Sequence, residues 1–172
     1  VGTGRGLAIF NHSLQRFSPV YFNRYNSQIP EKINISLNSI GSDKSGNIYV
    51  GTSGWGLLTR GRAETICRTI PFVNGSVILG DYNVSGMLTE NNNVWVFVSG
   101  QGLSLFDAKT QTLRPVNQEV RFANCLFSDS AGMIRVGTES GLYCYSIEAK
   151  KYIQHYTERA GELSDKNVTA IG

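Results

Sequence analysis

A short glycine-rich motif occurs four times in this chain of 172 residues, and the repetition restricts the possible folds more than any other feature. Each copy ends in a Gly-Leu pair. The pairs begin at residues 6, 56, 102 and 141, so they are 50, 46 and 39 residues apart. A propeller blade of four strands needs about 40 to 50 residues, which is the spacing seen here. The copies span Val1–Leu7, Val50–Leu57, Phe97–Leu103 and Val136–Leu142.

The sequence around the copies follows one order. An acidic residue opens a polar turn before the last three copies, at Asp43, Glu90 and Asp129, and a strand-like segment then leads into the motif. Aspartate caps the local backbone and glycine accepts positive φ, which is the chemistry of a hairpin turn. Two more alternating segments follow each Gly-Leu pair. This pattern indicates four antiparallel strands, A to D, and predicts an all-β chain: a β-propeller segment of about four four-stranded blades.

The repeats have approximate boundaries at 1–33, 34–83, 84–121 and 122–166, and residues 167–172 start strand A of another unit. Either the two chain ends complete one split blade of a small closed ring, or the chain is an open arc of a larger propeller. We favour the open arc, because four blades is the low end for propellers and the first residue falls inside a motif. An open arc leaves unpaired sheet faces, so we expect concentration-dependent association.

Composition argues against several classes of function. The net charge of +3 is spread along the chain without a run of five Lys or Arg, so we expect no nucleic-acid partner. Three cysteines without a C-x-x-C pair and two histidines predict neither a zinc site nor another cofactor. The recurring acidic residues occupy turn positions, so we expect no enzyme active site in this segment. The alternative is a catalytic site that further blades complete.

The second copy, from Asp43 to Leu57, resembles the two-component regulator propeller repeat. The fourth copy matches from Asp129 to Leu142, with Arg135 where an aromatic residue is usual, and the third departs most, at residues 97–99. The resemblance implies the periplasmic sensor region of a hybrid histidine kinase, of the kind in gut Bacteroidetes that recognises breakdown products of complex polysaccharides. It also implies a parent chain that is anchored in the inner membrane and carries the kinase for signal transduction.

Ligand recognition in a propeller is expected at the B-to-C and D-to-A connections, which emerge on one face around the central axis. The residue before each Gly-Leu pair differs between copies, and these four are candidate ligand-binding residues: Arg5, Trp55, Gln101 and Ser140. Trp55 offers a flat apolar surface on which a sugar ring could stack, or it covers the end of its own blade. Trp95 lies within a strand and is expected to pack between blades.

The D-to-A connections at Pro19–Lys32 and Pro71–Asn83 are long and irregular in sequence, and they combine tyrosines with asparagines, which suits polar ligands. Tyr82 and Asn83 therefore join the candidate site. The leading hypothesis is an extracytoplasmic sensor domain that binds a glycan or oligosaccharide, regulates a histidine kinase and self-associates through the sensor region or the remaining blades. The alternatives are a protein-interaction scaffold and structural spacer blades without direct ligand contact.

Overall fold

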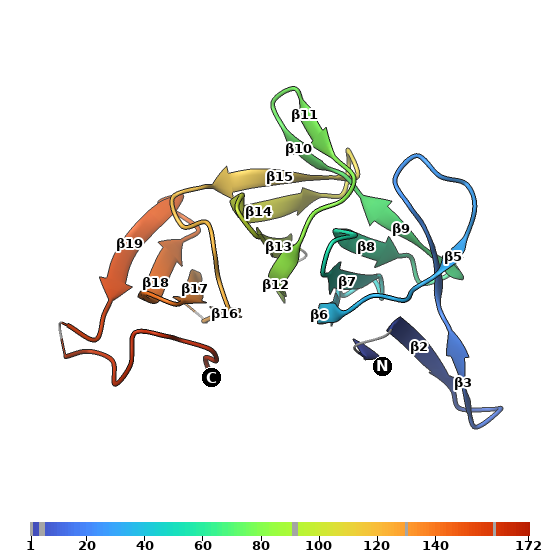
Figure 1. Cartoon of the computed structure of the whole chain (residues 1–172), viewed down its shortest axis with the longest axis horizontal. Coiled ribbons are helices and arrows are strands. Elements are labelled where there is room, and N and C mark those ends of the chain that lie inside the picture. The colour runs from blue at the N-terminus through green and yellow to red at the C-terminus, as the bar shows by residue number, and fades with distance from the viewer. Residues whose placement is uncertain (1, 4–5, 91–92, 130, 160) are drawn as a thin grey trace.

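The computed structural model describes residues 2–3, 6–90, 93–129, 131–159 and 161–172 of the chain. This part consists of strands, turns and loops, which confirms the all-β prediction. Its strands form four sheets that follow one another along an open arc (Figure 1), and we call the antiparallel meander of three or four consecutive strands in each sheet a blade, numbered 1 to 4 in chain order. Within the described residues, no helix is long and apolar enough to cross a membrane.

Each blade is a meander of antiparallel strands. Blade 1 comprises β1 (Gly2–Thr3), β2 (Gly6–Asn11) and β3 (Arg16–Pro19). Blade 2 comprises β6 (Leu37–Ser42), β7 (Ile48–Thr52), β8 (Leu57–Arg60) and β9 (Ile66–Ile70). Blade 3 comprises β12 (Val84–Glu90), β13 (Asn93–Val98), β14 (Gly102–Asp107) and β15 (Thr112–Asn117). Blade 4 comprises β16 (Cys125–Ser128), β17 (Met133–Thr138), β18 (Gly141–Ser146) and β19 (Lys151–Tyr156).

An aspartate fixes the turn between the first two strands of blades 2 and 4. In blade 2, Oδ1 of Asp43 accepts hydrogen bonds from the N–H groups of Ser45 and Asn47, both at 2.9 Å. Asp129 accepts two backbone N–H groups in the same way in blade 4. Gly46 completes the first of these turns with a φ of +82°, which a residue with a Cβ atom rarely adopts. The turn chemistry read from the sequence is therefore present in both blades.

Apolar cores between consecutive blades hold the arc together. The core between blades 2 and 3 contains Tyr49 and Leu57 from one blade and Val96 from the next. In the core between blades 3 and 4, Trp95 is only 4% exposed and lies against Tyr145. Trp95 therefore packs between blades, as the sequence predicted. Successive residues of a strand face opposite sides of its sheet, so one inner strand supplies side chains to two cores.

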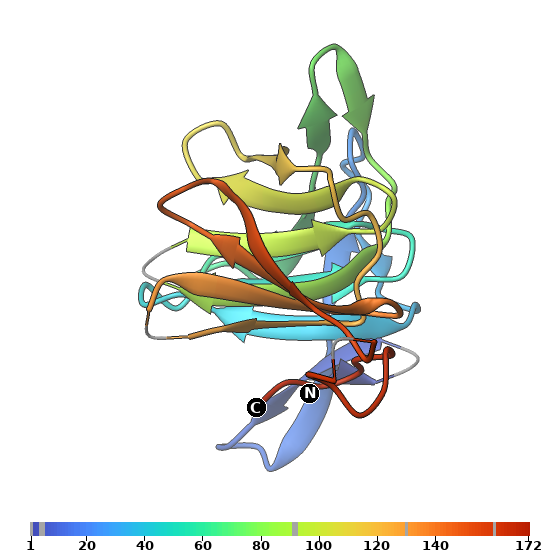
Figure 2. The ribbon, with the colours of Figure 1, turned by 90° about the vertical axis from the view of Figure 1, so that its left-hand side faces the viewer.

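The two long D-to-A connections are not irregular, which corrects the expectation for Pro19–Lys32 and Pro71–Asn83. Each contains a hairpin whose first strand pairs in parallel with the outer strand of the following blade, β4 with β9 and β10 with β15. The β10–β11 hairpin, drawn in green, projects beyond the sheets in Figure 2. The hairpins are formed by β4 (Tyr21–Asn23) with β5 (Glu31–Lys32) and by β10 (Phe72–Asn74) with β11 (Val77–Leu79).

A proline marks the point where the chain passes from one blade to the next. Pro71 separates β9 from β10, and its carbonyl oxygen accepts the N–H of Leu113 in β15 at 2.9 Å. Proline has no N–H, so it interrupts the ladder of its own blade while its carbonyl joins the ladder of the next. The hairpin strands are two or three residues long, too short for alternation to reveal them in the sequence.

Residues 167–171, expected to begin strand A of another unit, form no strand in the structure. They follow blade 4, where the N–H of Val168 donates to the carbonyl of Thr138 at 2.9 Å. A strand needs partners along its length to form a ladder, and among the described residues β1 pairs with β2 alone. Both chain ends lie apart on the inner side of the arc (Figure 1). The described chain is therefore an open arc and not a closed ring.

Gly51 tests how closely blades 2 and 3 pack. A Cβ atom on Gly51 would lie 2.5 Å from Cγ1 of Val84 in the next blade. We expect Gly51→Ala to lower the free energy of unfolding by about 1 to 3 kcal/mol, because overpacking displaces neighbouring groups. Gly61→Ala is the matched control, since its Cβ would meet only the flexible side chain of Glu64. Urea titration measures both, and equal stabilities would contradict the close approach.

Asp43 makes stability depend on pH. Burial raises the pKa of its carboxyl, but hydrogen bonds from Asn47, Tyr49 and Ser45 outweigh burial and hold that pKa below the ordinary 3.8. A lowered pKa stabilises the folded state above the unfolded value, and this stability is lost as pH falls through the folded value.

We therefore expect Asp43→Asn to be less stable than the wild type at neutral pH and to lose less stability on acidification from about pH 5 to about pH 2. Urea unfolding at several pH values measures this difference. Asp81→Asn, a change at an exposed carboxyl, is expected to follow the wild type. Parallel acid profiles for Asp43→Asn and the wild type would show that the turn does not contribute in this way.

Candidate functional site

The B-to-C turns and the D-to-A connections form one continuous rim, here called the loop face. In blade 2, the N–H of Gly56 donates to the carbonyl of Tyr82 in the following connection at 2.8 Å. In blade 3, the N–H of Gly100 donates to the carbonyl of Arg121 at 2.7 Å. These bonds fix each turn against the connection that enters the next blade, so side chains on the loop face have defined positions.

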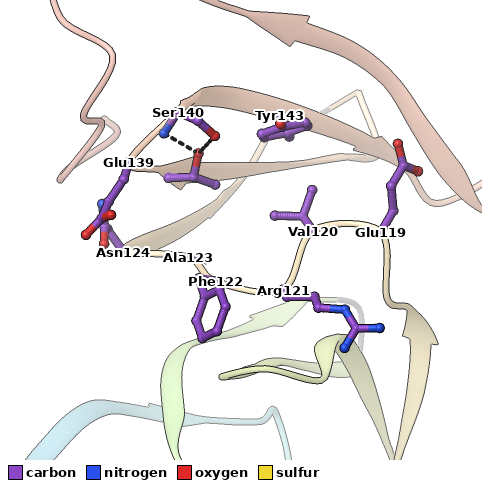
Figure 3. A pocket seen from close by; sticks show the side chains of 10 residues that line it. Glu119, Val120, Arg121, Phe122, Ala123, Asn124, Glu139, Ser140 and Tyr143 are labelled. Carbon is purple, nitrogen blue, oxygen red and sulfur yellow. Dashed lines mark hydrogen bonds between the residues drawn. The ribbon is translucent and has the colours of Figure 1, made fainter.

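A pocket of about 740 Å³ opens on the loop face where blades 3 and 4 meet (Figure 3). Its walls are the connection between β15 and β16 and the B-to-C turn of blade 4. The volume lies within the range of roughly 300 to 1,000 Å³ that is usual for small-molecule sites. The lining includes Glu119, Arg121, Phe122, Asn124, Glu139 and Ser140.

The pocket combines an aromatic ring with charged groups. Phe122 is 69% exposed although its side chain is large and apolar. The lining also includes the carboxylates of Glu119 and Glu139 and the guanidinium of Arg121, which come from both walls. An exposed ring provides an apolar surface for the C–H face of a sugar, while carboxylates and guanidinium groups hydrogen-bond hydroxyls. In the part of the chain that is described, no group of three or more His, Cys, Asp or Glu side chains is placed to hold a metal ion.

Ser140, one of the predicted residues, lines this pocket. Its N–H donates to Oγ1 of Thr138 at 3.0 Å, and the two hydroxyl oxygens are 3.2 Å apart. Its carbonyl oxygen lies 3.0 Å from Nε2 of His155, whose ring stacks on Tyr143 with the centroids 3.8 Å apart. Side chains from β17, β18 and β19 therefore hold the turn and the Tyr143 wall of the pocket together.

Trp55 is engaged by the hairpin β4–β5. Its ring stacks on Phe22 with centroids 4.7 Å apart and an interplanar angle of 18°. The guanidinium carbon of Arg24 lies 4.8 Å from the centre of the indole. Trp55 is half-buried as a result. These contacts join Trp55 to the connection that enters blade 2.

Tyr82 is a buried structural link, with 7% of its surface exposed. Its hydroxyl donates to the carbonyl of Ile70 at 2.6 Å and accepts the N–H of Leu57 at 3.1 Å. Burial raises the pKa of this hydroxyl well above its ordinary value, so it stays protonated and keeps both roles. Neighbouring Asn83 is exposed, and its carbonyl accepts the N–H of Ser99 at 3.0 Å.

Those predicted residues that the structure describes lie in different places and do not converge on one cavity. Ser140 lines the pocket, and Gln101 contacts Gln118 at 3.4 Å, at the start of the connection that forms one wall. Trp55 is partly buried at the junction of blades 1 and 2, where it packs against a cluster of buried apolar residues. Arg5 lies outside the described residues.

Phe122 was not predicted from the sequence, and it lies in the shortest of the connections between blades. Its signal is an aromatic residue next to Arg121 at a D-to-A position, whereas Tyr82 was predicted from the combination of tyrosine with asparagine. The prediction rested on the two long connections, where tyrosines occur together with asparagines. In the structure most of the two long connections forms hairpins. The short connection forms no hairpin, and its residues 119–124 line the pocket on the loop face.

Tyr82→Phe tests the link between β8 and β9. We expect it to lower the free energy of unfolding by about 1 to 3 kcal/mol, because the buried carbonyl of Ile70 and N–H of Leu57 lose their partner. Tyr25→Phe, at an exposed tyrosine, is the control and is expected to change stability little. Thermal and urea unfolding measure the stability of both variants. If Tyr82→Phe were as stable as the wild type, the Tyr82 hydroxyl would not contribute to stability.

No family model and no curated protein matches the chain. The resemblance to the two-component regulator propeller repeat therefore stays a prediction. Similar solved structures do exist, and the chain covers only about a quarter of the length of the two considered next.

Both structures are of the extracellular domain of BT4673 from B. thetaiotaomicron. One, described as a hybrid two-component system, has a TM-score of 0.75 and 22% identity, over 98% of this chain and 22% of the other. The second, described as a one-component system, has a TM-score of 0.65 and 20% identity, over 98% of this chain and 28% of the other. At these identities the likeness shows a shared fold.

Proposed function

We propose that the chain is part of an extracytoplasmic sensor domain that binds a glycan or oligosaccharide and regulates a histidine kinase. The fold shared with the extracellular domain of a two-component system supports this assignment. In this proposal the domain lies in the periplasm, and the kinase and the inner-membrane anchor belong to the parent chain. The role given to this segment is binding, without catalysis or a cofactor.

The pocket between blades 3 and 4 is the observation that carries the binding proposal. Phe122 leaves most of its ring in water, and stacking of a sugar would cover that apolar surface. Glu119 and Glu139 can accept hydrogen bonds from hydroxyls, and Arg121 can donate to them. Two carboxylates against one guanidinium favour a neutral oligosaccharide over a polyanionic one.

The position of the pocket links binding to signalling. One wall belongs to the connection that leaves blade 3, and the other belongs to the turn of blade 4. A ligand that contacts both walls stabilises the relative orientation of blades 3 and 4 in which both contacts can form. A ligand can bias signalling only through such a difference in affinity between two arrangements. We infer that ligand binding restricts the movement of blade 4 relative to blade 3.

A protein-interaction scaffold is the second candidate, and the outer rim supplies the observation that favours it. Ile29, Val77 and Ile78 are 74%, 53% and 54% exposed on the two hairpin segments. The segments are neighbours, because Gly80 lies against the side chain of Tyr25. Exposed apolar side chains away from the pocket suit a protein partner. Spacer blades, the third alternative, would use neither surface.

Phe122→Ala tests the sensor proposal. We expect the wild-type chain to bind at least one member of a broad oligosaccharide panel and the variant to bind it at least about fivefold more weakly, because the stacking surface is lost. Isothermal titration calorimetry measures both affinities. Tyr21→Ala is the matched control, since Tyr21 is an aromatic residue 44% exposed on β4 at the outer rim.

Three outcomes would redirect the proposal. A panel without binding, by calorimetry and by thermal shift, would reject glycan sensing by this segment. Equal weakening by Phe122→Ala and Tyr21→Ala would move the site away from the pocket. A stoichiometric protein partner that is lost in Ile78→Asp, with no effect of sugars, would favour the scaffold.

A further inference from the structure

The hairpin β10–β11 presents an apolar strand edge at the outer rim of the arc. Among the strands that the structure describes, β11 is the outermost of a six-stranded sheet, so only one of its sides is paired. Val77 and Ile78, two of its three residues, are 53% and 54% exposed. Figure 2 shows that the hairpin extends past the sheets, which therefore do not cover it. An open strand edge is a template for pairing with a second chain.

Ile78 directs its backbone groups toward this open edge. Asn74 pairs with Val77 and closes the two-residue turn of the hairpin, and the next pair is Val73 with Ile78. The pair that closes such a turn exchanges both backbone hydrogen bonds, and bonded and non-bonded pairs then alternate along the ladder. Val73 and Ile78 are therefore a non-bonded pair. The N–H and C=O of Ile78 point away from β10 and are available to another strand.

The matching edge of the first hairpin is protected, whereas this one is not. There the outer strand β5 consists of Glu31 and Lys32, directly after Pro30. Charged side chains and proline at an edge are the usual means of preventing pairing with other chains. β11 is Val-Ile-Leu, and residues 71–80 contain no charged side chain. Two hairpins with the same place in the repeat thus differ in the feature that decides whether an edge can pair.

The edge of β11 is complementary to itself. When two copies of β11 lie antiparallel with Ile78 opposite Ile78, each Ile78 donates its N–H to the carbonyl of the other. Val77 then stands opposite Leu79 of the second copy on both sides of the centre, which gives apolar cross-strand pairs. Asp81, the first charged residue after the strand, stands opposite Gly75. No like charges meet in this register.

The neighbouring hairpin extends the apolar surface around this edge. A Cβ atom on Gly80 would lie 3.0 Å from Cβ of Tyr25, so the segment that follows β11 touches the loop between β4 and β5. Tyr25 and Ile29 in that loop are 38% and 74% exposed. Apolar side chains beside the strand edge lose contact with water when a second chain covers them.

We propose that two copies of this chain form a symmetric dimer in which their β11 strands pair antiparallel about Ile78. The pairing joins two six-stranded sheets into one. A second copy is the occupant that fits, because the edge matches itself in hydrogen bonding, apolar side chains and charge. The contact is small, so the dimer is weak and depends on concentration. The hairpin does not line the pocket between blades 3 and 4, so dimer formation is independent of sugar binding.

Ile78→Pro tests the strand pairing. Proline removes the outward N–H but no bond between β10 and β11, and an edge strand tolerates it where the N–H faces solvent. We expect sedimentation equilibrium from micromolar to millimolar protein to show the wild type passing from monomer to dimer. Ile78→Pro is expected to raise the dissociation constant about tenfold or more, because the symmetric dimer loses two equivalent hydrogen bonds.

A charge at the same position is expected to have at least as large an effect. Ile78→Lys places two ammonium groups opposite each other at the centre of the pairing. Ile153→Lys is the matched control, since it adds the same charge at a residue that is 48% exposed on the outer strand β19. The control is expected to dimerise like the wild type.

Cross-linking tests the register. Opposite Cα atoms of a hydrogen-bonded antiparallel pair are about 5.5 Å apart, within the reach of a disulfide. We expect Ile78→Cys to give a covalent dimer on a non-reducing gel after oxidation with diamide. Val77→Cys is the control, because the two copies of residue 77 are diagonal neighbours roughly 7 to 8 Å apart. The wild type, with its three free cysteines, gives the background.

Three results would overturn the proposal. The first is a monomer at every concentration. The second is a dimer that Ile78→Pro and Ile78→Lys both leave intact. The third is a dimer that Ile78→Lys weakens and Ile78→Pro does not, which would indicate contact between side chains without strand pairing. Circular dichroism verifies folding, and the comparison of Ile78→Cys with Val77→Cys carries the test if Ile78→Pro does not fold.

Discussion

A blade of this chain has two apolar faces, and it can bury neither of them by itself. In β13, Val94, Val96 and Val98 face blade 2, while Trp95 and Phe97 face blade 4. Burial of one large apolar side chain contributes about 1.5 to 3 kcal/mol, so each inner strand depends on both neighbours. Stability is then the sum of what single blades and pairs of adjacent blades contribute. The cross-blade bonds of the loop face, and with them the pocket walls, exist only because this packing fixes the blades.

The repeat period and the turn aspartates were enough to predict the four sheets, because both depend on local chemistry. Trp95 was placed correctly since its position in a strand decides which core it enters. The hairpins β4–β5 and β10–β11 were not predicted, because strands of two or three residues are too short to show alternation. The roles of Trp55 and Tyr82 depend on Phe22 and on Ile70, contacts that only the assembled blades create. The pocket around Phe122 likewise depends on the spacing between two blades, which no single repeat encodes.

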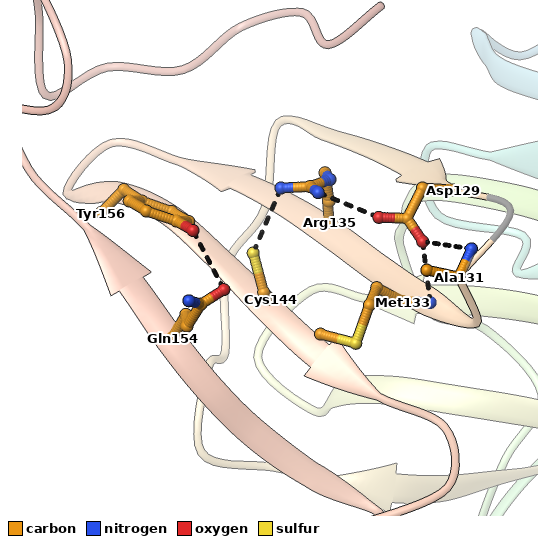
Figure 4. Close-up of polar contacts among 7 residues, drawn as sticks. All are labelled: Asp129, Ala131, Met133, Arg135, Cys144, Gln154 and Tyr156. Atoms are coloured by element: carbon orange, nitrogen blue, oxygen red, sulfur yellow. Dashed lines mark hydrogen bonds and ion pairs between the residues drawn. The ribbon is translucent and has the colours of Figure 1, made fainter.

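Arg135 shows how one copy of a repeat can differ in a side chain while the turn that anchors it stays the same. At the position that Tyr49 holds in blade 2, Arg135 donates to the turn aspartate of its own blade (Figure 4), as the Tyr49 hydroxyl does.

The parallel pairs β4–β9 and β10–β15 tie the rims of neighbouring blades together at two junctions, and among the described residues the junction of blades 3 and 4 has no such tie. Parallel pairs of this kind resist bending, so we expect the arc to bend most easily between blades 3 and 4. The pocket lies at this same junction, so a molecule that contacted both of its walls would stiffen the arc where no hairpin does.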